Sequence, residues 1–64
     1  MKKVEAQLIH DMRNTATVIR GAAEMLHASY HALSPAAIDH VTSMLARRSD
    51  MLARLLEDLA TVNA

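Results

Sequence analysis

His10 is the residue with the clearest capacity for chemistry in this chain of 64 residues. A neutral imidazole is a competent nucleophile near neutral pH when one ring nitrogen is held in the right tautomer and the other is free to attack. Asp11 follows directly, and its carboxylate can accept the proton of one ring nitrogen. Asn14 lies one helical turn further on, at i+4 from His10, where its amide can orient an attacking water. These three residues favour phosphoryl transfer through His10.

Each of these residues also has an ordinary interpretation. A single histidine on a helix is commonly a solvent-exposed residue without chemistry, and Asp and Asn are common on solvated helix faces. A second use of histidine is metal binding by His27 and His31, which stand four apart and close in sequence to His40. Because the chain has no cysteine and no clear fourth ligand, we expect no metal site and interpret these histidines as part of a polar hairpin tip.

Two long helices are predicted to position these residues. Ser34 and Pro35 indicate an N-cap followed by a first helical position. Upstream, Gly21 either marks a close approach of helices or is absorbed at a cost of about 1 kcal/mol relative to Ala. We therefore predict an all-α single domain over 1–64. It has a helix over about 2–30, a turn over about 31–34 and a helix over about 35–62, paired as an antiparallel hairpin.

Apolar residues recur along both predicted helices in alternating steps of three and four, the pattern of a packing seam. The predicted seam of the first helix is Ile9, Met12, Ala16, Ile19, Ala23, Leu26, Tyr30 and Leu33. The predicted seam of the second helix is Ile38, Val41, Leu45, Arg48, Leu52, Leu55, Leu59 and Val62. The stripes are widened by Val18, Met25, Met44, Met51 and Leu56. One partner helix cannot cover stripes of this width, so we predict a homodimer in which two hairpins form a four-helix bundle.

Two polar residues are placed by these seams. His10 falls one step past the first seam, so we expect its imidazole to point to solvent beside the groove between the helices. Arg48 is the one charge on the second seam. Its stem packs while its guanidinium reaches solvent or an acidic neighbour, or it forms a polar layer that fixes register. The methionines, at helical spacing, are interpreted as core filler rather than as a docking surface.

Composition excludes several classes of function. Seven Lys and Arg balance seven Asp and Glu, so no general electrostatic attraction to nucleic acid or anionic membrane exists. No apolar run approaches the roughly 20 residues of a membrane span, and no signal-peptide core follows Met1-Lys2-Lys3. We expect a cytoplasmic protein with no nucleic-acid partner and no direct membrane contact.

The segment around His10 resembles the H-box of sensor histidine kinases, which belongs to their dimerisation and histidine-phosphotransfer domain. The matching residues are Leu8-Ile9-His10-Asp11-Met12-Arg13-Asn14, then Ala16, Ile19, Gly21 and Glu24-Met25-Leu26. The resemblance covers nearly the whole chain, because the run from Leu52 through Leu55-Leu56-Glu57-Asp58-Leu59 is similar to the end of that domain's second helix. The H-box is a fairly specific motif, whereas the second-helix pattern is not.

The resemblance implies a role for each H-box residue. His10 would be the phosphoacceptor, Asp11 the acid/base beside it, and Asn14 the residue that positions water during dephosphorylation, while Arg13 has a less defined role. Phosphate would come from Mg-ATP on a separate ATP-binding domain of the kinase and pass to an aspartate on a response-regulator receiver domain. The chain has no ATP-binding segment, so we expect it to bind no cofactor and to be inactive alone.

Residues on the second helix are candidates for partner recognition. With the turn centred near residue 32, antiparallel pairing brings His10 opposite the region from Arg54 to Leu56. The expected partner-binding residues at this end of the bundle are Arg13, Arg54, Glu57 and Asp58.

The sequence departs from the family at Thr15, where most members have a proline that kinks the helix, so helix bending is not expected as a catalytic step. The chain stops just past the second helix, which favours a piece of a larger kinase over a free-standing phosphorelay protein. A full-length kinase of this kind can be membrane-anchored. A non-catalytic helical-hairpin adaptor or dimerisation module is the alternative from another class of function.

Overall fold

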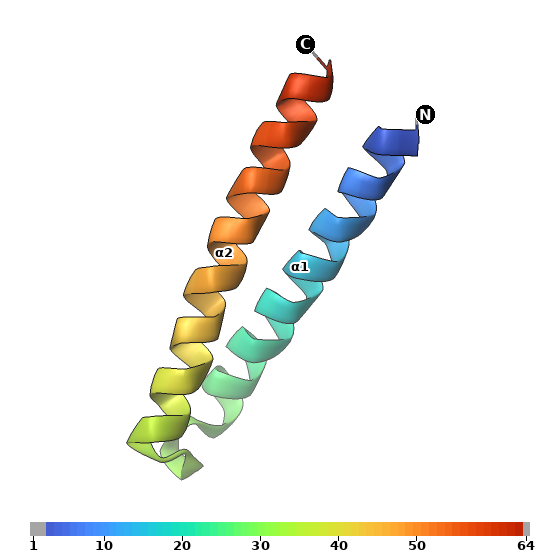
Figure 1. Cartoon of the computed structure of the whole chain (residues 1–64). Coiled ribbons are helices and arrows are strands. Elements are labelled where there is room, and N and C mark those ends of the chain that lie inside the picture. Colours follow the sequence, from blue (N-terminus) through green and yellow to red (C-terminus); the bar gives the residue numbers. More distant parts are fainter. Residues whose placement is uncertain (1–2, 64) are drawn as a thin grey trace.

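The chain folds as a helical hairpin. The computed structural model describes residues 3–63, and side chains are described up to residue 62. Helix α1 covers Lys3–Ser29, a single 3-10 turn η1 covers Tyr30–Ala32, and α2 covers Pro35–Asn63. The long helices run antiparallel in a rod of 45 × 15 × 12 Å, with the start of α1 and the end of α2 at the same end (Figure 1). The predicted all-α hairpin is confirmed, while the predicted helix start at residue 2 lies outside the described residues.

The start of α2 is fixed by Ser34. Its Oγ accepts a hydrogen bond from the backbone N–H of Ala37 at 3.1 Å, and its carbonyl accepts the first helical bond from Ile38 at 3.0 Å. Pro35 occupies the first helical position, where its missing N–H leaves no unpaired donor. The short connection from η1 to this cap forces the chain to reverse, which makes the helices antiparallel.

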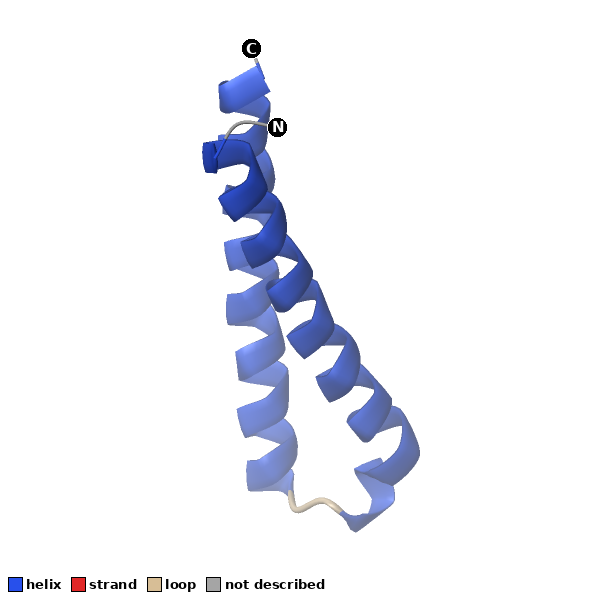
Figure 2. Ribbon diagram, turned by 90° about the vertical axis from the view of Figure 1, so that its right-hand side faces the viewer, coloured by secondary structure: helices blue, strands red, loops and turns tan. Residues whose placement is uncertain are grey.

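The helices are inclined rather than strictly parallel, and in the view of Figure 2 their axes diverge toward the turn. Within residues 3–63, neither helix is both long enough and apolar enough to cross a membrane.

The seam predicted on α2 is confirmed. Every residue of it is buried or half-buried, and Val41 is the most buried at 9 % exposure. Arg48 lies half-buried within this seam, and its Nη1 reaches the sulfur of Met51 at 3.9 Å. The half-buried position agrees with the interpretation in which the stem of Arg48 packs, while its guanidinium meets the sulfur of Met51 rather than an acidic neighbour.

The seam predicted on the first helix is wrong at three of its eight residues. Met12, Ile19 and Leu26 face α2 as predicted, and Ile9 and Leu33 are half-buried, but Ala16, Ala23 and Tyr30 are exposed. The residues that alternate with the first three on the inner side are Leu8, Thr15, Ala22 and Ser29. Met12, Ile19 and Leu26 belong to two possible seams, one with Ala16 and one with Thr15. The seam with Ala16 contains more apolar residues, because Thr15 is polar, so the sequence favours the wrong one.

Thr15 is nevertheless the most buried residue of α1, at 3 % exposure. Its hydroxyl donates to the backbone carbonyl of Asp11 at 2.8 Å, so burial leaves no unpaired donor. The same hydroxyl lies 3.6 Å from the sulfur of Met51 on α2. A threonine that satisfies its own hydroxyl locally can therefore stand at a core position.

The hairpin has a thin core. Among the residues described, Val41 is the only buried hydrophobic residue, and even this residue keeps 9 % exposure. The exposed surface is 4869 Å², whereas a compact protein of 7.0 kDa exposes about 4,000 Å². The large hydrophobic residues that remain exposed are Val4, Val18, Met25, Tyr30, Met51 and Leu56. A single hairpin thus leaves about 800 Å² more surface in water than its mass requires.

Gly21 does not mark a close approach of the two helices. It is exposed, and a Cβ atom built on it would meet no atom within 4 Å. The packing interpretation of this glycine is therefore wrong for the hairpin, and Gly21 is a residue that α1 tolerates at a cost in helix stability.

Candidate functional site

His10 lies on the outer side of α1. Leu8 and Met12, each two residues away, face α2, and two residues correspond to about 200° around a helix. The imidazole therefore points away from α2 and is exposed, as predicted. The expectation that it lies beside the groove of the hairpin is wrong, because the inner seam runs through Leu8 and Thr15 rather than through Ile9 and Ala16.

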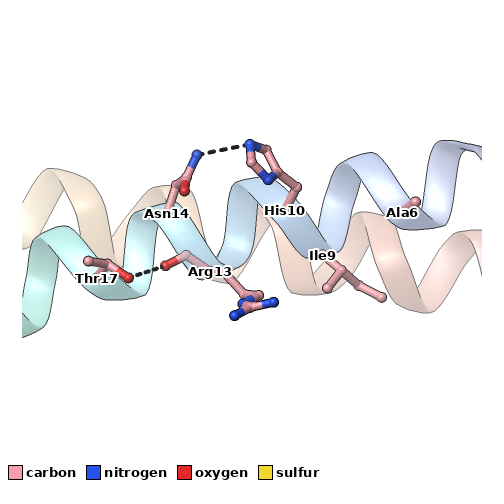
Figure 3. Close-up of a pocket in the computed structure, with 6 residues that line it drawn as sticks. All are labelled: Ala6, Ile9, His10, Arg13, Asn14 and Thr17. Atoms are coloured by element: carbon pink, nitrogen blue, oxygen red, sulfur yellow. Dashed lines mark hydrogen bonds between the residues drawn. The ribbon is translucent and has the colours of Figure 1, made fainter.

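A shallow depression surrounds His10, and every residue that lines it comes from α1 (Figure 3). The lining residues are Ala6, Ile9, His10, Arg13, Asn14 and Thr17. The site in one hairpin is thus an open surface that a second molecule can approach freely.

His10 and Asn14 are brought together as the i+4 spacing predicts. The amide nitrogen of Asn14 lies 3.2 Å from Nε2 of His10 (Figure 3). An N–H donated by this amide requires a lone pair on Nε2, and in a neutral ring the proton is then on Nδ1. The contact fits the tautomer in which Nε2 carries the lone pair and Nδ1 the proton.

Asp11 is not joined to His10. Its Oδ1 accepts a hydrogen bond from Nε2 of Gln7 at 3.1 Å, and the residue is half-buried on the flank of α1. In a single hairpin the carboxylate predicted as the acid/base is therefore hydrogen-bonded to Gln7 and not to the imidazole of His10. Gln7 was not among the predicted site residues, although its i+4 spacing from Asp11 is a signal for this bond.

Arg13 lines the depression but points elsewhere. Figure 3 shows its guanidinium directed away from the His10–Asn14 pair. Its backbone carbonyl accepts a bond from the hydroxyl of Thr17 at 2.8 Å. Arg13 is exposed, so its charge is available to a partner at the rim of the site.

The level of each residue along the hairpin is set by the contact between Thr15 and Met51. Residues of α1 and α2 lie level with each other when their numbers sum to about 66, so His10 is level with Leu56. This agrees with the predicted pairing. Arg54, Glu57 and Asp58 are exposed on α2 near this level, but they do not share a surface with His10 in one hairpin.

A second depression, which the sequence analysis did not single out, lies on the outside of α2. It is lined by Arg47, Asp50, Met51 and Arg54. Arg47 and Arg54 are seven residues apart and so lie on one helix face, which is the sequence signal for this pair of cations.

Other polar groups form only exposed contacts. Arg20 and Glu24 make an ion pair of 2.9 Å with side chains that are 80 % and 65 % exposed, so the pair contributes little to stability. The ring of His31 lies against that of Tyr30, with centroids 3.9 Å apart. Over the described range, no three His, Asp or Glu residues are grouped so as to hold a metal ion.

Comparison of the chain with known protein families, with curated proteins and with solved structures found no match in any of the three.

Proposed function

We propose that this chain is the dimerisation and phosphoacceptor domain of a sensor histidine kinase in two-component signal transduction. His10 takes the γ-phosphate of ATP and passes it to an aspartate on the receiver domain of a response regulator. The observation that supports this most directly is an exposed imidazole whose Nε2 is paired with Asn14 at 3.2 Å, within the H-box sequence. Mg-ATP is the substrate of a separate ATP-binding domain.

The transfer step follows from the tautomer that Asn14 selects. When Asn14 moves aside, the lone pair of Nε2 attacks the terminal phosphorus of ATP. The bond from phosphorus to the bridging oxygen breaks, and ADP leaves with that electron pair. The ring then carries a positive charge, which it loses when a carboxylate accepts the Nδ1 proton.

Dephosphorylation uses the same pair of residues. Asn14 sits within one turn of Nε2, so its amide can hold a water in line with the nitrogen–phosphorus bond. In this dephosphorylation step Asp11 has the acid/base role, for which its carboxylate must first release the hydrogen bond from Gln7. Arg13, Arg54 and Asp58 contact the ATP-binding domain or the receiver, while Glu57, expected in the same set, is given a different role in the dimer below.

The homodimer belongs to the same proposal. The hairpin exposes about 800 Å² more than a compact protein of its mass, and about 800 Å² is what each partner of a standard protein interface buries. Two hairpins packed as a four-helix bundle would cover part of this surface, and the face on which they pack determines which exposed apolar residues become buried.

Phosphorylation tests this function. The chain is mixed with the ATP-binding domain of a histidine kinase and Mg-ATP, and acid-labile phosphate is mapped by mass spectrometry. We expect phosphate on His10, and we expect none in His10→Gln, which should keep its helicity because His10 is exposed. A folded wild-type chain that stays unlabelled by a donor active on its own substrate would contradict the proposal.

The second candidate is a non-catalytic dimerisation or adaptor hairpin. The observation in its favour is that Asp11 is bonded to Gln7 and leaves His10 without a carboxylate in one hairpin. This candidate predicts the same dimer and no phosphate on His10 under the conditions above.

A further inference from the structure

The two flanks of the hairpin differ in chemistry. One flank, here named the alanine face, consists of Ile9, Ala16 and Ala23 on α1 with Thr42, Ser49 and Leu56 on α2. The opposite flank, the methionine face, consists of Asp11, Val18 and Met25 on α1 with Met44, Met51 and Asp58 on α2. Each face follows from helical spacing on either side of the inner seam.

Charge favours the alanine face as the surface between two copies. The alanine face contains no ionisable side chain, and its alanines and serine allow two helices to approach closely. Of the exposed large hydrophobic residues it holds Leu56, whereas Val18, Met25 and Met51 lie on the methionine face, so charge rather than apolar area selects the alanine face. On the methionine face, Asp11 and Asp58 lie near the same level of the hairpin. A two-fold dimer through that face would bring four carboxylates out of water, which is costly.

Charges beside the alanine face are complementary between the two helices. Arg13 and Arg20 lie on α1 just outside this face, and Asp39 and Glu57 lie on the corresponding side of α2. Asp50 instead shares a depression with Arg47 and Arg54 on the outside of α2. A two-fold axis parallel to the helices sets α1 of one copy antiparallel to α2 of the other at matching levels. The arginines beside the face on α1 then lie near the carboxylates on α2 of the other copy.

This arrangement determines what stands next to His10. Level matching places residue 56 of the second copy beside His10, and Glu57 is only one residue, about 1.5 Å, further along. Both side chains point out of the same side of the bundle, from helix axes about 8–10 Å apart. Between them the second copy presents Ala53 and Ala60, which are too small to block contact.

We propose that the site at His10 is completed by a second copy of this chain, which packs on the alanine face and supplies Glu57. The carboxylate of Glu57 accepts the Nδ1–H of His10, while Asn14 of the first copy lies at Nε2. His10 is thus held from both sides in the tautomer that attacks, and Glu57 takes the Nδ1 proton after phosphoryl transfer. The chemistry rests on the function proposed above, whereas the packing does not.

The packing is tested without any phosphoryl donor. The chain has no cysteine, so each thiol in the experiment is an introduced one. His10→Cys and Glu57→Cys are prepared separately, mixed, and treated with a short bismaleimide. We expect a covalent dimer that contains one copy of each variant, detected by mass spectrometry.

The matched control is Arg54→Cys in place of Glu57→Cys. Arg54 lies at nearly the same level of α2 but toward the methionine face, so it should cross-link poorly to His10→Cys. Stronger coupling through Arg54 than through Glu57, or no mixed dimer from either pair, would overturn the proposal.

Mixing experiments test the role of Glu57 in trans. With a phosphoryl donor, Glu57→Gln should lower labelling of His10 by at least about tenfold, as expected for loss of a proton acceptor. Adding His10→Gln copies, which cannot be labelled themselves, should restore labelling because mixed dimers place an intact Glu57 beside an intact His10.

The outcomes separate the two proposals. Labelling that is lost in Glu57→Gln and not restored by His10→Gln copies overturns supply of Glu57 by the second copy. A wild-type chain that forms the expected cross-link but takes no phosphate on His10 overturns the proposed function and keeps the packing. Labelling of His10 with no cross-link overturns the packing and keeps the function.

Discussion

At the scale of single residues, Asn14 is the group proposed to act in dephosphorylation of His10 more than in its phosphorylation. Its amide nitrogen lies 3.2 Å from Nε2 of His10 in the free hairpin. Asn14→Ala should slow loss of phosphate from His10 by about tenfold or more, because the water is no longer oriented, and should change phosphorylation less. Time courses of labelling and of decay measure the two rates, and an equal loss in both would remove the water-positioning role.

Comparing Thr15 with Thr17 shows how much burial of a threonine contributes to the free energy of unfolding. Both hydroxyls donate to the carbonyl four residues earlier at 2.8 Å, but Thr15 is 3 % exposed and Thr17 is exposed. Thr15→Ala should therefore be less stable than Thr17→Ala by about 1–2 kcal/mol, since only the first loses packing against Met51. Urea denaturation measures this difference, and the change in helix propensity cancels between the two variants.

At the scale of secondary structure, Gly21 is a weak point of α1 that no packing contact requires. A methyl group at this position meets open space, so Gly21→Ala should raise the free energy of unfolding by about 0.5–1 kcal/mol. The change should leave cross-linking between copies unaltered. A loss of stability in this variant would show that another molecule packs closely on Gly21.

The positions of the helices could be predicted from the sequence, whereas the side of α1 that packs on α2 could not. Ser34 and Pro35 predict the start of α2, and the regular spacing of its apolar residues identifies its inner side correctly. On α1, Met12, Ile19 and Leu26 fit two seams, and only the packed hairpin shows that Thr15 rather than Ala16 is inside. That shift of one position also moves His10 from the edge of the groove to the outer side of α1.

The local pair in the site follows from spacing, whereas the partner of Asp11 does not. Asn14 meets His10 because residues four apart on a helix are neighbours. By the same rule Asp11 can meet Gln7, and this contact prevails over one with the adjacent His10. Sequence spacing alone does not rank two such contacts.

At the scale of the whole molecule, the thin core predicts that folding and association are coupled. In the proposed homodimer, a hairpin that exposes 4869 Å² and buries one hydrophobic residue, Val41, is expected to gain most of its stability from the second copy. The melting temperature should therefore fall by about several degrees for each tenfold dilution. Circular dichroism over a hundredfold range measures it, and a melting temperature independent of concentration would indicate a hairpin that is stable alone.

The single tight turn between η1 and Ser34 sets the order in which contacts between the two helices form and open. Contacts near the turn close short loops, whereas those near Leu8 close a loop of most of the chain, so the hairpin zips from the turn outward. The reverse process opens the other end first. Amide hydrogen exchange should then be slowest around Val41 and fastest near the start of α1. His10 thus lies toward the end of the hairpin that is expected to open locally most often.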